Sequence, residues 1–155
     1  MSCVSTCFWF DRSAEAAATL YTALIPNSRI VSIMRHGEGA PMPAGHAHVV
    51  DFELDGVPYR ALNGGPMYKL NEAASISVSC ETQAEIDKLW DALTAEGGRE
   101  LACGWLVDRF GLTWQIIPSR LNEWMSNPAA AARVVAAFMP MMKLDIATLE
   151  AAARG

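Results

Sequence analysis

The stretch FDRSAE at residues 10–15 recurs as CETQAE at residues 80–85, an offset of 70 in a chain of 155 residues. The register of the repeat continues as far as Arg29 in the first copy and Arg99 in the second. In both copies a β-rich run leads through a polar turn into an amphipathic helix. A repeat at a fixed period indicates two copies of one supersecondary unit, each too small to bury its hydrophobic face alone. The sequence therefore predicts two related modules.

Strand and helix signals follow the same order in each copy. Periodicity and turn residues in the first copy predict a strand, a helix and three strands, at residues 5–10, 14–24, 29–35, 46–54 and 57–63. In the second copy they predict a strand at residues 75–80, a helix that includes residues 86–93 and ends before Gly97, and further strands at residues 100–107 and 112–117. The second copy is thus expected to be shorter by about one strand or a long loop. The fold class is α+β, with two βαβββ modules.

Beyond Pro118 the sequence becomes rich in Ala, Met and Leu and predicts short helices at residues 121–126, 129–139 and 144–153. The predicted organisation is a first module at residues 1–68, a second at 69–118 and a helical tail at 119–155. Such apolar helices exceed what a small two-module core needs, so we expect the tail to pack over an edge or on a second subunit. A homodimer with the tail as its contact is the expected assembly.

Composition excludes several classes of partner. Twelve Lys and Arg against seventeen Asp and Glu give a net charge of −5, which repels nucleic acid and anionic membrane surfaces. No apolar run is long enough to span a membrane and no signal peptide is evident, so the expected location is the cytoplasm. Four cysteines without a CxxC pair predict neither disulfides nor a zinc knuckle. A mean hydropathy of +0.15 suggests an apolar cavity or a partner surface.

Three phrases resemble a known family: CFWFD at residues 7–11, ALNGGP at 61–66 and CGWLVDRFGLTWQIIP at 103–118. They are similar to the PhnB-like branch of the vicinal oxygen chelate superfamily, which includes glyoxalase I, bleomycin-resistance proteins and extradiol dioxygenases. The resemblance implies paired βαβββ modules around a cavity, with modules exchanged between subunits as one possibility. Members are often labelled 3-demethylubiquinone-9 3-methyltransferase-like. We do not expect that activity, because no glycine-rich loop follows a parallel strand to hold a nucleoside-bearing methyl donor.

Metal-dependent members of the superfamily take ligands from the first and last strand of each module. Here those positions fall on Thr6, on one of residues 59–61, on Ser75 and on Gln115, of which only Gln115 is a usable ligand. We therefore expect no usual divalent metal and no other cofactor. His46 and His48, two apart on a strand, are weak metal candidates, but Asp51 and Glu53 lie on the other parity. A hydrogen-bonded or solvated pair is the favoured interpretation of the two histidines.

Strand parity selects the residues expected to line the cavity. If Thr6 faces inward, so does Phe8, and Ser75 and Ser77 form a second such pair. Trp105 could stack an aromatic ligand or belong to the core, and Asn63 could present its amide to a ligand or satisfy a turn. The candidate ligand-binding residues are Thr6, Phe8, Asn63, Ser75, Ser77, Trp105 and Gln115.

Two functions remain open from the sequence. The first is a protein that binds a small apolar or aromatic molecule without the usual metal. The second is a metal-dependent lyase, isomerase or dioxygenase that uses His46, His48 or Gln115. Cys80 and Cys103 have no histidine nearby in the sequence to activate them, and the predicted inner face carries no paired carboxylates. Whether the protein is an enzyme, and on what substrate, is left undecided.

Overall fold

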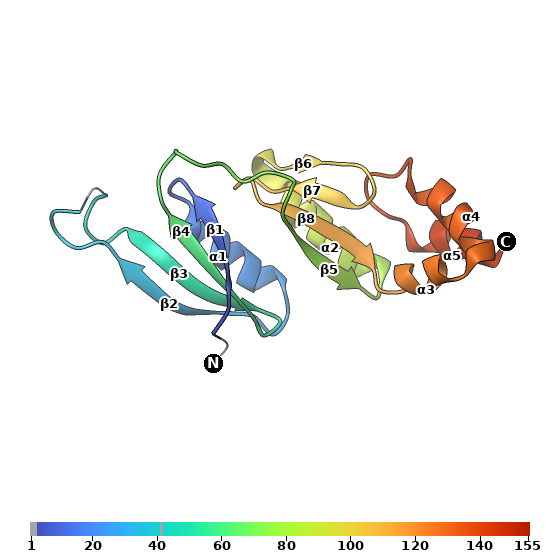
Figure 1. Ribbon diagram of the computed structural model, residues 1–155, viewed down its shortest axis with the longest axis horizontal. Helices are drawn as coiled ribbons and strands as arrows, with labels where there is room; N and C mark the ends of the chain where they lie inside the picture. The colour runs from blue at the N-terminus through green and yellow to red at the C-terminus, as the bar shows by residue number, and fades with distance from the viewer. Residues whose placement is uncertain (1–2, 41) are drawn as a thin grey trace. The chain divides into compact units, whose positions relative to one another are not determined.

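The computed structural model describes residues 3–40 and 42–155. Residues 1, 2 and 41 fall within the predicted first module and its long turn and lie outside the described residues. The chain divides into two compact units, Met1–Leu70 and Asn71–Gly155. Each unit contains a four-stranded sheet and a helix in βαβββ order, which confirms the predicted fold class (Figure 1). The helical tail belongs to the second unit.

In the first module, strand β1 is parallel to β4, and β4, β3 and β2 are antiparallel neighbours. The sheet order is β1-β4-β3-β2. Its elements are β1 (Thr6–Phe10), α1 (Ala14–Leu24), β2 (Arg29–Arg35), β3 (Ala47–Leu54) and β4 (Val57–Asn63). These bounds lie within a residue of those predicted, because glycine turns follow β2, β3 and β4.

The second module repeats this topology in the order β5-β8-β7-β6. Its elements are β5 (Ser75–Cys80), α2 (Gln83–Thr94), the 3-10 turn η1 (Ala95–Gly97), β6 (Arg99–Glu100), β7 (Trp105–Val107) and β8 (Thr113–Pro118). The single strand predicted over residues 100–107 is therefore wrong. Cys103 and Gly104 both adopt positive φ, 62° and 81°, and this left-handed turn divides the strand in two. The second module is consequently complete.

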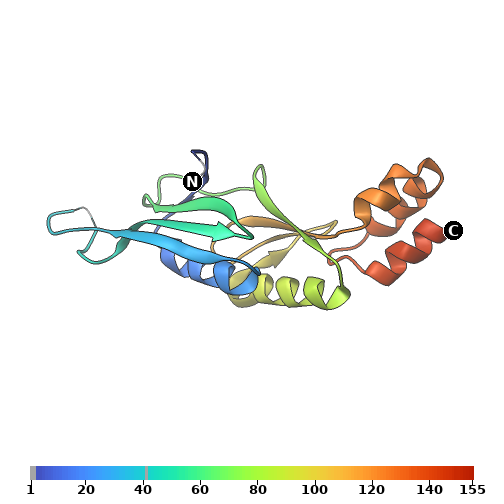
Figure 2. The same ribbon diagram turned by 90° about the horizontal axis from the view of Figure 1, so that it is seen from below.

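One helix covers one face of each sheet and leaves the other face uncovered by its own module's helix (Figure 2). In the first module Tyr21 of α1 contacts Phe52 of β3, with ring centres 6.3 Å apart, and both are fully buried. In the second module Trp90 of α2 and Trp114 of β8 are the largest fully buried side chains. Burial of such rings supplies most of the stability of each helix-covered face. The face away from the helix is called the open face below.

The two helices begin differently. The Thr82 hydroxyl oxygen accepts a hydrogen bond from the Glu85 backbone N–H, and the Glu85 carboxylate accepts one from the Thr82 N–H, which completes a capping box on α2. Ser13 makes no such bond at the start of α1. Instead, the Ala14 N–H donates to Oδ1 of the buried Asn63, at the end of β4, over 2.9 Å.

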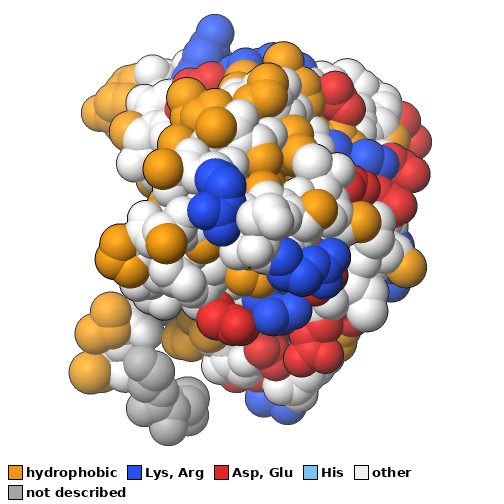
Figure 3. Space-filling view, turned by 90° about the vertical axis from the view of Figure 1, so that its right-hand side faces the viewer, with side chains coloured by type: hydrophobic (Ala, Val, Ile, Leu, Met, Phe, Trp, Pro, Cys, Tyr) orange, Lys and Arg blue, Asp and Glu red, His pale blue; other side chains and the backbone are white. Residues whose placement is uncertain are grey.

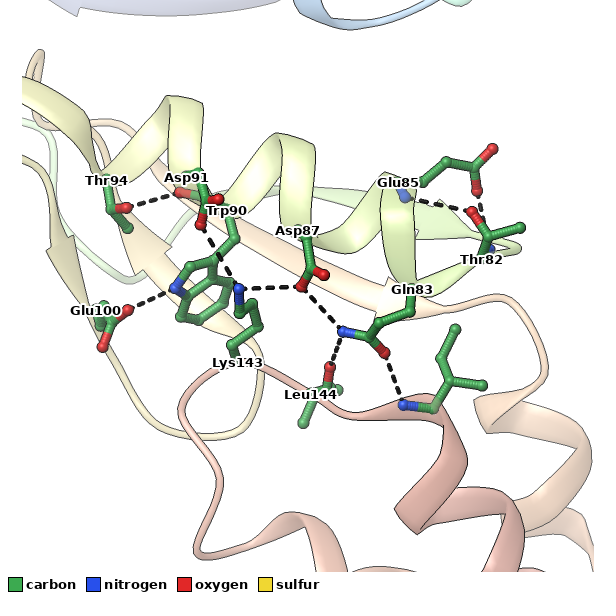
Figure 4. A network of polar contacts seen from close by, with 11 residues as sticks. Thr82, Gln83, Glu85, Asp87, Trp90, Asp91, Thr94, Glu100, Lys143 and Leu144 are labelled. Atoms are coloured by element: carbon green, nitrogen blue, oxygen red, sulfur yellow. Dashed lines mark hydrogen bonds and ion pairs between the residues drawn. The ribbon is translucent and has the colours of Figure 1, made fainter.

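The tail folds into three helices, α3 (Leu121–Ser126), α4 (Pro128–Phe138) and α5 (Ile146–Arg154). Their buried core consists of Trp124, Val134, Leu144 and Leu149. The tail docks on its own second module. Gln83 of α2 donates to the Leu144 carbonyl and accepts from the Ile146 N–H, at 3.1 and 2.9 Å, and Lys143 pairs with Asp87 at 3.0 Å (Figure 4). The tail thus extends the second unit.

The outer surface of the tail is of mixed character. Figure 3, which views the end where the C-terminal helices lie, shows hydrophobic side chains gathered beside clusters of both charges. Met125, Met139 and Met142 are among the exposed large hydrophobic residues. Within the described residues, none of the helices combines the length and the apolar character that crossing a membrane requires.

Candidate functional site

The open face of the second sheet brings together most of the residues predicted for a ligand site. Gln115 of β8 lies directly between Ser77 of β5 and Trp105 of β7 in the strand register. Its Nε2–H donates to Oγ of Ser75 over 2.8 Å. This bond engages the amide nitrogen, so that Gln115 Oε1 remains as the acceptor of the side chain on this face. The parity argument for this module therefore placed the side chains correctly.

Thr113, which strand parity places on the same side of β8 as Gln115, is a further polar residue of this face. It pairs with Ser75 in the register and is fully buried, yet its Oγ1 has no hydrogen-bond partner within residues 3–40 and 42–155. A buried hydroxyl without a partner costs roughly 1–3 kcal/mol. A bound molecule with a donor or acceptor group could remove that cost.

The parity predicted for the first module is wrong. Phe8 is buried and stacks on Tyr59, with ring centres 5.8 Å apart, and Tyr59 stacks in turn on Phe52 beneath helix α1. Thr6 pairs with Tyr59 and lies on this same side of β1. Cys7 and Trp9 consequently belong to the open face. The offset of 70 aligns Ser5, and not Thr6, with Ser75, so the first-strand position was assigned one residue too far along the chain.

The open face of the first sheet carries a charged pair that the sequence analysis missed. Arg60 of β4 pairs with Asp51 of β3 over 2.7 Å, and Ser32 of β2 donates to the same carboxylate over 3.1 Å. The Arg60 hydrogen bond holds the pKa of Asp51 below its ordinary value. Burial raises the pKa of the Cys7 thiol, although the Arg60 charge opposes this shift. Cys7 is therefore a poor nucleophile despite its position.

A pocket of about 270 Å³ opens in this part of the first module. Its lining includes Ser5, Asp51, Glu53, Tyr59 and Arg60. The expectation that the inner face has no pair of carboxylates is thus wrong for this module, because Asp51 and Glu53 share one parity of β3. Aligning the last turns at Gly56 and Gly111 makes Arg60 the counterpart of Gln115. That alignment was the signal from which Arg60 could have been found.

Asn63 and Trp9 have structural roles. Asn63 donates from Nδ2 to the Ala47 carbonyl over 2.9 Å and accepts from Ala14, so both halves of its amide are engaged within the first module. The sequence analysis expected Asn63 either to contact a ligand or to satisfy a turn, and the structure shows instead that it joins the start of α1 to β3. Trp9 donates to the Gly65 carbonyl over 2.8 Å, and a Cβ on Gly64 would lie 2.2 Å from its ring. Only glycine permits this approach.

His46 and His48, expected to form a pair, have different neighbours. The ring centre of His48 lies 4.5 Å from that of His36, which directly follows β2. His46 is exposed, and its Nδ1 lies 3.2 Å from the Pro43 carbonyl oxygen. A break in the pairing of β2 with β3, between Met34 and Arg35, displaces the register at this end of the hairpin.

The usual metal positions of the superfamily do not fit a divalent ion. Ser75 and Gln115 offer a hydroxyl and an amide already bonded to each other, and Thr6 lies on the helix-covered side. Hydroxyls and amides lack the charge and basicity of carboxylate and imidazole ligands. Among residues 3–40 and 42–155, no three His, Cys, Asp or Glu side chains are grouped to hold a metal. No chemical step is therefore derived through a metal at these positions.

The βαβββ pair and its open faces define the chain as a member of the vicinal oxygen chelate superfamily. Within it, the chain belongs to the family described as 3-demethylubiquinone-9 3-methyltransferase, whose model matches residues 2–117. A structure described as a putative 3-demethylubiquinone-9 3-methyltransferase, PhnB protein, from Bacillus cereus is 30% identical with a TM-score of 0.70. It covers 76% of this chain and 99% of its own.

More distant structures share the fold. Protein PA1353 from Pseudomonas aeruginosa is 21% identical, with a TM-score of 0.59 and coverage of 74% of this chain and 95% of its own. The fosfomycin resistance protein FosX from Mesorhizobium loti is 10% identical, with a TM-score of 0.55 and coverage of 81% and 98%. No curated protein matches the chain. The family match ends at residue 117, so helices α3 to α5 lie beyond it.

Proposed function

We propose that the protein binds a small apolar or aromatic molecule on the open faces of its sheets, without the divalent metal of the superfamily. One observation supports this most directly. Each open face carries a hydrogen-bonded polar pair, Arg60 with Asp51 and Gln115 with Ser75, and Arg60 and Gln115 occupy equivalent positions of the repeat. Ligand sites in proteins combine apolar walls with a few fixed polar groups of this kind.

In the second module, the chemistry suits a flat molecule with a polar edge. The indole of Trp105 offers an aromatic surface, and Gln115 is its direct neighbour in the register. Ser77 lies on the other side of Gln115 and is exposed. A ligand ring on Trp105 could donate a hydrogen bond to Gln115 Oε1 and exchange a second with the hydroxyl of Ser77.

The methyltransferase activity in the family description is not part of this proposal. A nucleoside-bearing methyl donor is typically held by a glycine-rich loop between a strand and a helix. Here the connections from β1 to α1 and from β5 to α2, residues 11–13 and 81–82, contain no glycine. Both connections are instead occupied by residues that start the helices.

We also propose that the chain is a homodimer. Strand β2 forms an edge of the first sheet, runs for seven residues and exposes Val31 and Met34 to 54% and 61%. An unpaired apolar edge of this length is a site where a second strand can add. Sedimentation at micromolar concentration should give a mass near twice the 16.8 kDa of one chain. A mass near one chain would refute the dimer.

The binding proposal is tested with the full chain. Native mass spectrometry of freshly purified protein should reveal a co-purified small molecule, and 1-anilinonaphthalene-8-sulfonate should bind saturably. We expect Gln115→Leu and Trp105→Ala each to weaken dye binding at least about 5-fold, which corresponds to roughly 1 kcal/mol.

The matched control is Arg12→Met on the exposed surface, where the guanidinium lies 3.8 Å from the Asp11 carboxylate. Dye binding that is absent, or that Arg12→Met reduces as much as Gln115→Leu, would contradict the proposal.

A further inference from the structure

All three histidines of the chain lie in one hairpin, formed by β2, β3 and their connection. His36 directly follows β2 and His48 is the second residue of β3. The His36 N–H donates to the His46 carbonyl over 2.9 Å, which fixes the two strands at this point. The rings of His36 and His48 then lie 4.5 Å apart with their planes inclined by 55°.

Each of these two rings buries a nitrogen atom with no hydrogen-bond partner. His36 Nε2 and His48 Nδ1 are both inaccessible to solvent and unpaired within residues 3–40 and 42–155. The third buried side-chain atom of this kind is Thr113 Oγ1, in the other unit. Two neighbouring rings therefore each offer a nitrogen atom that no other described group engages.

We infer that His36 and His48 form a binding site for a divalent transition-metal ion that prefers imidazole, such as Cu²⁺, Ni²⁺ or Zn²⁺. With metal–nitrogen bonds of about 2.0–2.1 Å, two imidazoles bound at roughly a right angle have ring centres about 4.5–5 Å apart. The observed 4.5 Å agrees with this geometry. Neutral imidazole is the commonest protein ligand of these ions, whereas Mg²⁺ and Ca²⁺ require oxygen ligands.

The neighbouring charges permit a cation here. Arg35 precedes His36, but its guanidinium donates to both carboxylate oxygens of Glu15, at 2.7 and 2.9 Å. This pair neutralises the positive charge next to the site, and it holds the pKa of Glu15 below its ordinary value. No third His, Cys, Asp or Glu of the described residues completes a cluster, so the ion would have to bring water as its other ligands, with the rings moving apart to admit it.

The site is distinct from the superfamily's metal positions, which fall on the first and last strands of each module. It is also independent of the proposed ligand site, because the hairpin belongs to the first unit and Gln115 to the second. Loss of dye binding in Gln115→Leu should therefore leave metal binding unchanged.

The test is titration of the metal-free full chain with CuCl₂, NiCl₂ and ZnCl₂ by calorimetry. We expect one ion per chain at micromolar affinity. His36→Ala and His48→Ala should each weaken the affinity at least about 10-fold, because even the loss of a residue that only supports a metal ligand costs that much. His46→Ala is the matched control, and it should change the affinity less than about 2-fold because its exposed ring lies outside the pair.

Electron paramagnetic resonance of the wild-type Cu²⁺ complex gives a readout that does not depend on the folding of a variant. We expect superhyperfine structure from two imidazole nitrogens. His36→Gln and His48→Gln, checked by circular dichroism, repeat the test with conservative replacements. Absence of binding at micromolar concentration, equal loss in His46→Ala, or a spectrum without imidazole nitrogen would each overturn the assignment.

Discussion

The two halves of the repeat start their helices by different means, although they descend from the same sequence pattern. In the second module the cap of α2 is local, since Thr82 and Glu85 are three residues apart. In the first module the N–H of Ala14 is satisfied by Asn63, which is 49 residues away and at the end of the last strand. The start of α1 therefore depends on the completed sheet, whereas α2 can begin before its sheet forms.

Asn63→Ala and Thr82→Ala test this difference most strongly. Asn63→Ala leaves the Ala14 N–H and the Ala47 carbonyl unpaired in a buried position, so we expect a loss of about 3 kcal/mol in the free energy of unfolding. Thr82→Ala should lose only about 1 kcal/mol, the usual value for an N-cap. Urea denaturation followed by circular dichroism measures both. Equal losses would show that the remote cap is no more than a local one.

The last turns of the modules offer a second contrast. Asp108 is buried, and its Oδ1 accepts from the N–H groups of Phe110 and Leu112, while Oδ2 accepts from the Trp114 indole. Asp108→Asn retains one acceptor oxygen and turns an N–H₂ group toward a donor. We expect a loss of about 2 kcal/mol. Asp55→Asn, in the exposed equivalent turn where φ is 46°, should change stability by less than about 0.5 kcal/mol.

The tail distinguishes the second module from the first. Gln83→Ala removes both hydrogen bonds from α2 to the segment that precedes α5. We expect a loss of about 1 kcal/mol and faster cleavage of the tail in limited proteolysis, with the 1–118 portion persisting. Arg12→Met on the first module is the control. An unchanged cleavage rate would mean that the core around Trp124 holds the tail without these bonds.

The smallest expected effect is a dependence of stability on pH. Hydrogen bonds from the N–H groups of Thr82 and Glu81 hold the pKa of Glu85 below its ordinary value of 4.5. A depressed carboxyl pKa stabilises the fold at pH above 4.5, and that stabilisation disappears as the pH falls through the folded-state pKa. Glu85→Gln should therefore reduce the fall in the free energy of unfolding between pH 6 and about 3, measured by urea denaturation. An unchanged fall would exclude this contribution.

Thiol reactivity provides a further check of the two faces. Burial raises the pKa of Cys80 to about 11, and the nearby Glu85 charge adds to the shift. At pH 8 the Cys80 thiol is thus protonated, and labelling with 5,5′-dithiobis(2-nitrobenzoate) should be slow there and fast at the exposed Cys3. Mass spectrometry of the labelled chain identifies the order. Early modification of Cys80 would show that this side chain of β5 is not buried.

The local patterns predicted most of the fold because they depend on short-range chemistry. The helix that follows Thr82 and the strand Ser75–Cys80 are both evident from capping residues and alternation. The division of residues 100–107 was not predicted, because the turn at Cys103, where φ is 62°, is held by hydrogen bonds from the N–H groups of Cys103 and Gly104 to the Met141 and Met142 carbonyls of the tail. A non-glycine residue carries no sequence signal for that conformation.

The facing of the side chains was predicted in one module and not in the other for a similar reason. Parity carries one assignment along a strand, so starting correctly at Ser75 and at Gln115 placed their neighbours, whereas starting at Thr6 inverted the first strand. The pairing of His36 with His48 depends on the break in register after Met34, which tertiary contacts determine. Aligning the repeat copies residue by residue would have corrected the first error but not the second.

The contact of Trp9 with Gly64 has an optical consequence. Trp9 is the only one of the five tryptophans before residue 71, since the others are at positions 90, 105, 114 and 124. Its indole is half-buried, hydrogen-bonded to Gly65 and in edge contact with Tyr68 at 5.0 Å, so its emission should shift to the red when this corner opens. The difference in fluorescence between the wild type and Trp9→Phe would therefore report the melting of the first half of the repeat alone.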